Sequence, residues 1–109
     1  MRADEDRLAD MLDAAEAVVR FTTGKARRDL DDEVLYWALV AQVTILGESA
    51  ARITEAGRER VPGIPWRAIV GMRNQLVHGY WSIDRDELWR TASVDMPALV
   101  ALLRSSGGG

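Results

Sequence analysis

Residues 64–79 read IPWRAIVGMRNQLVHG, and the architecture expected for the chain follows from this stretch. Its apolar residues recur at three- and four-residue spacing, which is the period of an amphipathic helix. Pro65 suits the first helical position because its missing N–H costs nothing there, and Gly79 suits the position after the last turn. We therefore predict a helix over residues 65–79. Its expected buried stripe comprises Trp66, Ile69, Val70, Leu76 and Val77.

The segments on either side of this helix are also helical by their apolar spacing. The first helix should end near Phe21, and the second should run from an aspartate cap within residues 29–32 to about Ala56. Asp84 opens a capping-box pattern for a fourth helix, which Pro97 should kink or restart. The residues expected to face the core are Leu8, Met11, Leu12, Ala15, Val18 and Val19 in the first helix, and Val34, Ala38, Ala41, Ile45 and Ile53 in the second.

Together these elements predict an all-α, four- to five-helix up-and-down bundle. The 109 residues fit a single domain, and a hydrophobic content of 48% suffices for one continuous core. We assign residues 1–104 to this helical domain and residues 105–109, which are Ser and Gly, to a flexible tail. The sequence contains neither an internal repeat nor a strand pattern.

Composition narrows the cellular setting and the kinds of site. Cysteine is absent, which excludes disulfides and thiolate metal ligands. The N-terminal residues 1–6 are too acidic for a signal peptide, and we expect no apolar run approaching the roughly 18 residues of a membrane span. These features predict a cytoplasmic protein without a membrane partner.

Charge is distributed unevenly along the chain. The net charge of −3 argues against a protein that coats nucleic acid through bulk electrostatics. Residues 50–80 nevertheless carry five arginines against two glutamates, a local balance of +3. Such a local basic patch suits a phosphate-bearing ligand, although a solvated helix face rich in arginine would show the same pattern. These arginines are Arg52, Arg58, Arg60, Arg67 and Arg73.

A charged residue interrupts the apolar stripe of the helix over residues 65–79. Arg73 falls on its core-facing side, where a guanidinium needs a partner or a cavity. Glu48 stands at the matching place on the preceding helix, so we predict a charge-assisted pair between them. Gly47 and Gly71 lie inside helices, where glycine is unfavourable, and they indicate close approach between helices. A purely structural ion pair with two tolerated glycines would also explain the pattern.

The only histidine of the chain, His78, ends the same helix. Asn74 lies four residues earlier and therefore on the same face. Arg73 and His78 lie roughly 140° apart on an ideal helix. They can form one site within a single subunit only if the long Arg73 side chain bends around the helix toward His78. Alternatively, a second copy of the chain contributes one of the two residues. The alternative is that His78 merely caps the helix C-terminus.

The string Arg73-Asn74-x-x-x-His78-Gly79-Tyr80 resembles the R-x4-H-x-Y motif of HepT-like toxins in the HEPN superfamily of ribonucleases. The resemblance extends from the first helix to Leu103. It implies an all-helical homodimer with its active cleft at the interface and RNA cleavage that needs no metal or other cofactor. The supporting context is Gly47-Glu48, Ile64-Pro65-Trp66, Ile83-Asp84 and Trp89.

The resemblance also implies roles for individual residues. Arg73 and His78 would be catalytic, with Asn74 as a supporting polar residue beside the Glu48 partner. Tyr80 would be the residue that a cognate minimal nucleotidyltransferase antitoxin adenylylates, using ATP, to silence the toxin. The residue types fit cleavage through the RNA 2′-hydroxyl, because histidine moves protons near neutrality and arginine grips phosphate oxygens.

Three functions remain open at this point. The first is a metal-independent RNA endonuclease that acts as the toxin of a type VII-like toxin–antitoxin pair. The second is a non-catalytic HEPN-like binding module that docks a nucleotidyltransferase and holds a nucleotide or phosphate. The third is a plain structural dimer, which would leave the inward Arg73 and Glu48 without a purpose.

Overall fold

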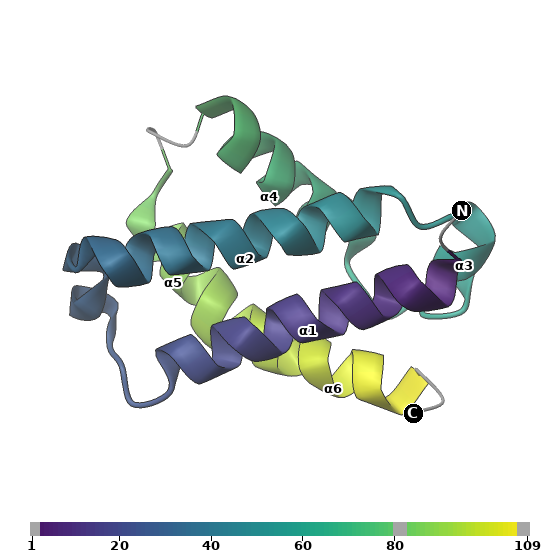
Figure 1. Ribbon diagram of the computed structural model, residues 1–109, viewed down its shortest axis with the longest axis horizontal. Helices are drawn as coiled ribbons and strands as arrows, with labels where there is room; N and C mark the ends of the chain where they lie inside the picture. The colour runs from purple at the N-terminus through teal and green to yellow at the C-terminus, as the bar shows by residue number, and fades with distance from the viewer. Residues whose placement is uncertain (1–2, 80–82, 107–109) are drawn as a thin grey trace.

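The computed structural model describes residues 3–79 and 83–106, and every regular element in these two ranges is helical (Figure 1). The predicted all-α bundle is thereby confirmed. The elements are α1 (Asp4–Thr22), a 3₁₀ turn η1 (Arg27–Asp31), α2 (Glu33–Ala51), α3 (Glu55–Glu59), α4 (Trp66–Gly79), α5 (Arg85–Arg90), a π-helical turn η3 (Thr91–Asp95) and α6 (Met96–Ser106).

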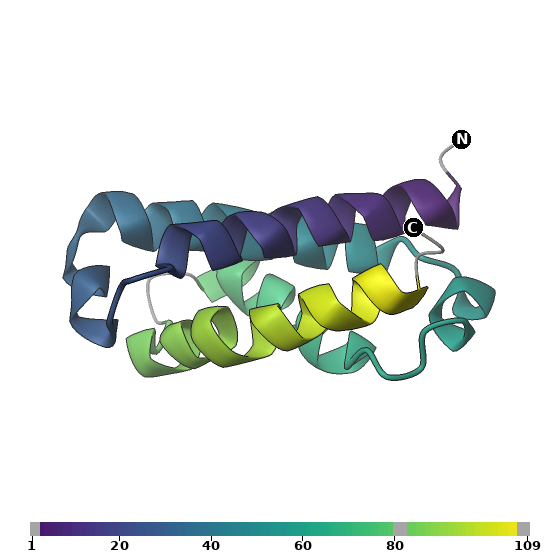
Figure 2. The same ribbon diagram turned by 90° about the horizontal axis from the view of Figure 1, so that it is seen from below.

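The helices form two layers around one core. Figure 2 shows α1 and α2 side by side in one layer, with α4 and α6 below them. Helix α1 packs on α2 and α6, whereas α4 packs mainly on α2. The largest fully buried side chains come from α1, η1, α2 and α5, and they are Met11, Val18, Leu30, Leu39, Leu46 and Leu88.

Side-chain caps fix where several helices begin. The Asp32 carboxylate accepts a 2.9 Å hydrogen bond from the Val34 N–H at the start of α2. The Asp84 carboxylate accepts a 2.8 Å bond from the Asp86 N–H at the start of α5. Such caps satisfy backbone donors that have no partner inside the helix. The cap predicted at Asp84 and the aspartate cap predicted before the second helix are both confirmed.

Helix α1 has the inner face that its sequence predicts. Met11, Ala15 and Val18 are buried. The remaining members of the predicted stripe are partly buried and pack against the core; they are Leu8, Leu12 and Val19.

The inner face and the end of α2 differ from the prediction. Its buried side chains include Leu39 and Val43, whereas Val34 and Ile45 of the predicted stripe are 77% and 46% exposed. The reason is that α2 is apolar on nearly every side, so its periodicity does not select one face. The helix also ends at Ala51 instead of continuing to about residue 56, because the chain turns and begins the separate helix α3.

The expectation that no segment could span a membrane needs a correction at α2. By length and composition alone, the 19 residues Glu33–Ala51 would suffice to cross one. In the bundle, however, α2 is the central helix, and its inner side is covered by α1 and α4. Burial between these helices accounts for its apolar character.

The last helical stretch changes its winding just before Pro97, where the sequence predicts a kink or a restart. The π-helical turn η3 precedes α6, whose second residue is Pro97. Proline lacks an N–H and its ring crowds the carbonyl four residues earlier, so the predicted restart is confirmed. Helix α6 continues through Ser105 and Ser106, which the sequence placed in a flexible tail. Residues 107–109 lie outside the described residues.

Candidate active site on α4

Helix α4 crosses α2 at close range, as Figure 1 shows, and Gly47 makes this approach possible. A Cβ atom at position 47 would lie 2.1 Å from Arg73 Cβ and 2.7 Å from Arg73 Cγ. Only a residue without a side chain fits there, which confirms the close approach predicted at Gly47. The stem of Arg73 therefore lies directly on the α2 backbone.

Two neighbouring side chains hold the Arg73 guanidinium. Its Nε and Nη2 donate hydrogen bonds of 2.9 and 2.6 Å to the same Glu48 oxygen, Oε1. Its Nη1 donates a 2.8 Å bond to Asn74 Oδ1. The predicted Glu48–Arg73 pair is thus confirmed, and Asn74 joins it. The rest of the guanidinium donor fork remains available to a ligand.

This ion pair is less buried than the sequence suggested. The side chains of Arg73 and Glu48 are 25% and 39% exposed. A pair at this depth can meet a ligand from solvent, whereas a fully buried pair could only brace the fold. Solvent also weakens the interaction, so the large cost of breaking a buried pair does not apply here.

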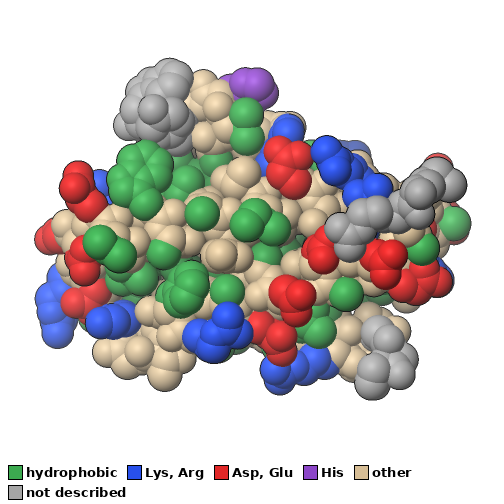
Figure 3. All heavy atoms as spheres, in the orientation of Figure 1, with side chains coloured by type: hydrophobic (Ala, Val, Ile, Leu, Met, Phe, Trp, Pro, Cys, Tyr) green, Lys and Arg blue, Asp and Glu red, His purple; other side chains and the backbone are tan. Residues whose placement is uncertain are grey.

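His78 occupies the last turn of α4 and is exposed. Figure 3 shows it at the outer edge of the molecule. Arg73 turns toward α2, whereas the helical period places His78 roughly 140° away from it around α4. The structure therefore brings Arg73, Asn74 and Glu48 together and leaves His78 on a different side of the same helix. Tyr80, the predicted modification site, lies outside the described residues.

The predicted basic patch is smaller than the sequence indicates. Arg58 donates from Nη2 to the Ala50 carbonyl at 3.1 Å and lies over the Trp66 ring, 5.6 Å from its centroid. Arg60 lies 3.7 Å from the Asp4 carboxylate. These two arginines brace the ends of helices. Within residues 3–79 and 83–106, the exposed arginines of this run that have no acidic partner are Arg52 and Arg67.

An apolar surface on α2 and α4 escaped the sequence prediction. Trp37 and Ile45 of α2 are each 46% exposed, and Val77 of α4 is 41% exposed. Figure 3 shows hydrophobic side chains spread along the middle of this face, where α2 lies. Contiguous exposed apolar surface on a small protein commonly marks an interaction site. The signal in the sequence was the absence of any polar face on the second predicted helix.

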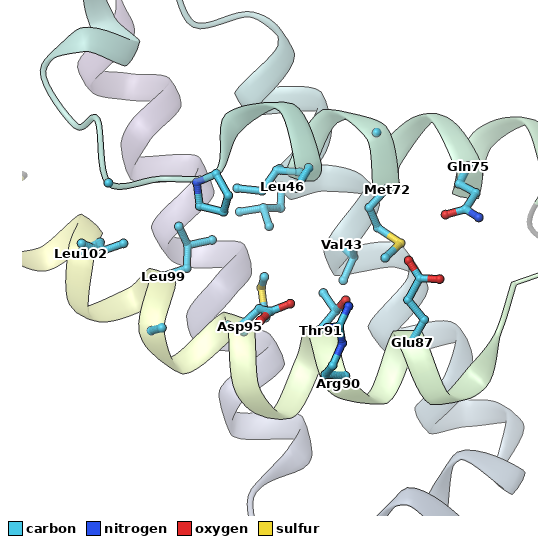
Figure 4. A pocket seen from close by; sticks show the side chains of 17 residues that line it. Val43, Leu46, Met72, Gln75, Glu87, Arg90, Thr91, Asp95, Leu99 and Leu102 are labelled. Atoms are coloured by element: carbon cyan, nitrogen blue, oxygen red, sulfur yellow. The ribbon is translucent and has the colours of Figure 1, made fainter.

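A cavity of about 500 Å³ opens on another side of α4, between it and the stretch from α5 to α6 (Figure 4). Val43 and Leu46 of α2 form part of its apolar floor, and Glu87 and Asp95 lie among its lining residues. Gly71 is in the α4 wall, and a Cβ there would meet no atom within 4 Å. The close helix approach predicted at Gly71 is therefore wrong within this chain. Neither Arg73 nor His78 lines this cavity.

Carboxylates and the histidine do not gather into a metal site in the part of the chain that the structure describes. No group of three or more potential metal ligands comes close enough there to hold an ion. The groups that α2 and α4 present at this site are the guanidinium of Arg73, the amide of Asn74, the carboxylate of Glu48 and the imidazole of His78.

Comparison with known proteins adds a family relationship. Residues 11–106 match the family described as Ribonuclease HepT-like. A Thermococcus cleftensis protein named Probable ribonuclease HepT is 33% identical over 99 residues, or 90% of this chain and 90% of that protein. MJ1380 of Methanocaldococcus jannaschii, named as a candidate RNase, is 32% identical over 93 residues, or 84% of this chain and 85% of that protein. No solved structure matches the chain.

Proposed function

The chain belongs to the HepT-like ribonuclease family, and from that membership we propose that it is an RNA endonuclease with Arg73 and His78 as its catalytic groups. The observation that carries this proposal is the arginine held by Glu48 and Asn74 at a partly exposed point of α4. A guanidinium that is fixed in place yet open to solvent suits the binding of a phosphate group.

The proposed reaction is a transesterification within the RNA strand. The 2′-oxygen attacks the adjacent phosphorus and the bond to the 5′-oxygen breaks, which leaves a 2′,3′-cyclic phosphate and a 5′-hydroxyl. The step needs a base for the 2′-hydroxyl proton, an acid for the leaving oxygen and positive charge beside the phosphorane. His78 would transfer protons, and Arg73 would bind the non-bridging phosphate oxygens.

One histidine cannot serve as base and acid in the same turnover, so we propose that two copies of the chain form one cleft. The exposed apolar face of α2 and α4 supports this homodimer, because burying Ile45 and Val77 against a second copy would remove them from water. Light scattering should give about twice 12.1 kDa at micromolar concentration. A clean monomer would remove the shared-cleft mechanism.

A matched pair of variants tests which face forms the dimer. Ile45→Asp places a charge on the apolar face and should produce monomers that cleave poorly. Val94→Asp is the control, since Val94 is 61% exposed on η3, outside that face, and its replacement should leave both assembly and cleavage intact. Dimers that survive Ile45→Asp but not Val94→Asp would place the interface elsewhere.

We further propose that the nuclease is a toxin silenced by modification of Tyr80. This proposal rests on the motif resemblance: a nucleotide added to Tyr80, two residues after His78, would bring bulk and negative charge to the place where RNA phosphate must bind. Incubation with a cognate nucleotidyltransferase and ATP should add AMP by mass, and Tyr80→Phe should block the addition. Modification at another residue would contradict this assignment.

The nuclease proposal is tested by the chemical requirements of cleavage. Cutting should persist in EDTA, because the chain has one histidine and no cysteine and the proposed steps use only protein side chains. It should fail on a strand whose cleaved nucleotide lacks the 2′-hydroxyl. Cleavage that required a divalent metal would contradict the mechanism, and a protein that binds RNA but never cuts it would be the non-catalytic binding module.

A further inference from the structure

Four residues form a row along the exposed side of α4, and one of them, Gly71, also lines the cavity between α4 and the stretch from α5 to α6. Arg67, Gly71, Asn74 and His78 are spaced at i, i+4, i+7 and i+11, so they follow one face of the helix. All four are exposed. The row spans about 16 Å, since each helical residue advances roughly 1.5 Å. It connects the proposed proton-transfer residue at one end of α4 with a cation near the other.

Arg67 is an exposed cation of α4. Neighbouring arginines are used within the protein: Arg73 pairs with Glu48, and Arg60 pairs with Asp4. By contrast, the described part of the chain offers Arg67 no acidic partner within ion-pair distance. An unpaired guanidinium in line with Asn74 and His78 favours an anionic ligand from outside the molecule.

Gly71 leaves the middle of the row bare. A side chain there would meet nothing within 4 Å, so packing inside the chain does not explain a residue that weakens the helix. A bare helix surface allows a ligand backbone to approach closely between Arg67 and His78. Close approach of a ligand backbone would therefore explain the glycine at position 71, which contacts within the fold do not explain.

We propose that the row Arg67–Gly71–Asn74–His78 binds the phosphate backbone of single-stranded RNA, with Arg67 as a substrate-positioning residue. The proposal rests on the proposed nuclease function and names the substrate class of that site. At about 3.4 Å per stacked nucleotide, the row corresponds to five nucleotides or fewer on one side of the cleaved bond. An extended strand can follow a straight helix ridge and leaves its 2′-hydroxyls accessible, whereas a rigid duplex can touch such a ridge only locally.

Steady-state cleavage of a ten-nucleotide single-stranded RNA tests the role of Arg67. Arg67→Ala should raise KM about two- to fivefold with little change in kcat, as expected for the loss of one solvent-exposed ionic contact. The log–log salt dependence of binding should become shallower by about 0.7, the value for one phosphate contact on a single strand. Arg67→Lys should restore most of this slope.

Two controls separate the row from general charge effects. Arg28→Ala removes the same charge from the exposed turn η1, outside α4, and should leave KM and the salt slope unchanged. Gly71→Glu places a carboxylate within the row and should raise KM, whereas Gly71→Gln should do so much less. A side chain at position 71 would meet nothing within 4 Å, and Arg28 and Arg67 are exposed, so circular dichroism should show intact helices in every variant.

Substrate length supplies an independent readout. For the wild type, KM should fall as the strand lengthens to cover the row and then level off, and Arg67→Ala should remove this gain. If wild type cuts RNA and Arg67→Ala has the same KM and salt slope as Arg28→Ala, the proposed binding of RNA along the row is refuted, whereas the proposed nuclease function is not. If wild type neither cuts nor binds the RNA, the proposed function itself fails. Equal affinity for a duplex of the same sequence would refute the single-strand assignment.

Discussion

Two glycines in the middle of helices provide a matched test of how α2 and α4 pack. Gly47→Ala and Gly71→Ala make the same chemical change, and each should gain about 0.5–1 kcal/mol of helix propensity. Their surroundings differ. The new Cβ at position 47 would lie 2.1 Å from Arg73 Cβ, whereas the new Cβ at position 71 would meet nothing within 4 Å.

The magnitude follows from that difference. Forcing one extra carbon into a packed contact costs about 1–3 kcal/mol. Gly71→Ala should therefore raise the free energy of unfolding by about 0.5–1 kcal/mol. The gain in helix propensity is the same for both variants. The free energy of unfolding of Gly47→Ala should therefore be lower than that of Gly71→Ala by the steric cost alone, about 1–3 kcal/mol. In a domain of this size, 1 kcal/mol shifts Tm by about 4–8 °C.

Urea denaturation followed by circular dichroism at two protein concentrations measures both values, and the second concentration separates folding from assembly. Gly47→Ala should also lower RNA cleavage, because it displaces the stem of Arg73. Equal stability of the two variants would refute the close approach of α2 and α4. A fully active Gly47→Ala would refute the claim that this approach positions the arginine.

The hydrogen bonds of Asp4 with Thr54 and the ion pair of Glu48 with Arg73 lead to two further predictions. Hydrogen bonds donated by the Thr54 hydroxyl and then by the Thr54 N–H lower the pKa of Asp4 below its ordinary value of 3.8. Their stabilising effect is therefore present above that value and lost as the pH falls through the folded-state pKa, so acid titration should destabilise wild type more steeply than Asp4→Asn. Glu48→Gln keeps an oxygen acceptor for Arg73 but loses the charge; it should change stability by less than about 1 kcal/mol and still reduce cleavage, as measured by urea titration and a gel assay.

Features governed by local periodicity could be predicted from the sequence. The inner face of α1, the extent of α4 and the cap at Asp84 depend on neighbouring residues, which the sequence shows directly. The contact between Glu48 and Arg73 is not local, yet it could also be predicted. Arg73 stands on the core-facing stripe of α4, where a charge requires a partner on a facing helix. Glu48 was placed inward by a predicted stripe of α2 whose members Val34 and Ile45 are exposed, so the pairing was predicted correctly but the depth of Glu48 was not.

Features that depend on which helix covers which face could not be predicted in this way. Helix α2 is apolar nearly all round, so only tertiary packing determines that Leu39 is buried and Val34 exposed. The size of the basic patch in residues 50–80 could not be predicted either, because it depends on tertiary contacts. The sequence does not reveal that Arg58 lies over Trp66 or that Arg60 faces Asp4. Gly47 and Gly71 look alike in sequence, and only one of them touches another helix.

RNA cleavage by His78→Ala, compared with that by wild type in the same assay, tests directly whether this chain is a ribonuclease that uses His78 for proton transfer. His78 is exposed in the last turn of α4, so its removal should leave the helical signal and the thermal midpoint nearly unchanged. Cleavage of single-stranded RNA in EDTA should fall by at least about 100-fold in His78→Ala, the usual contribution of a proton-transfer group. A folded His78→Ala protein that cuts RNA at the wild-type rate would contradict this role of His78.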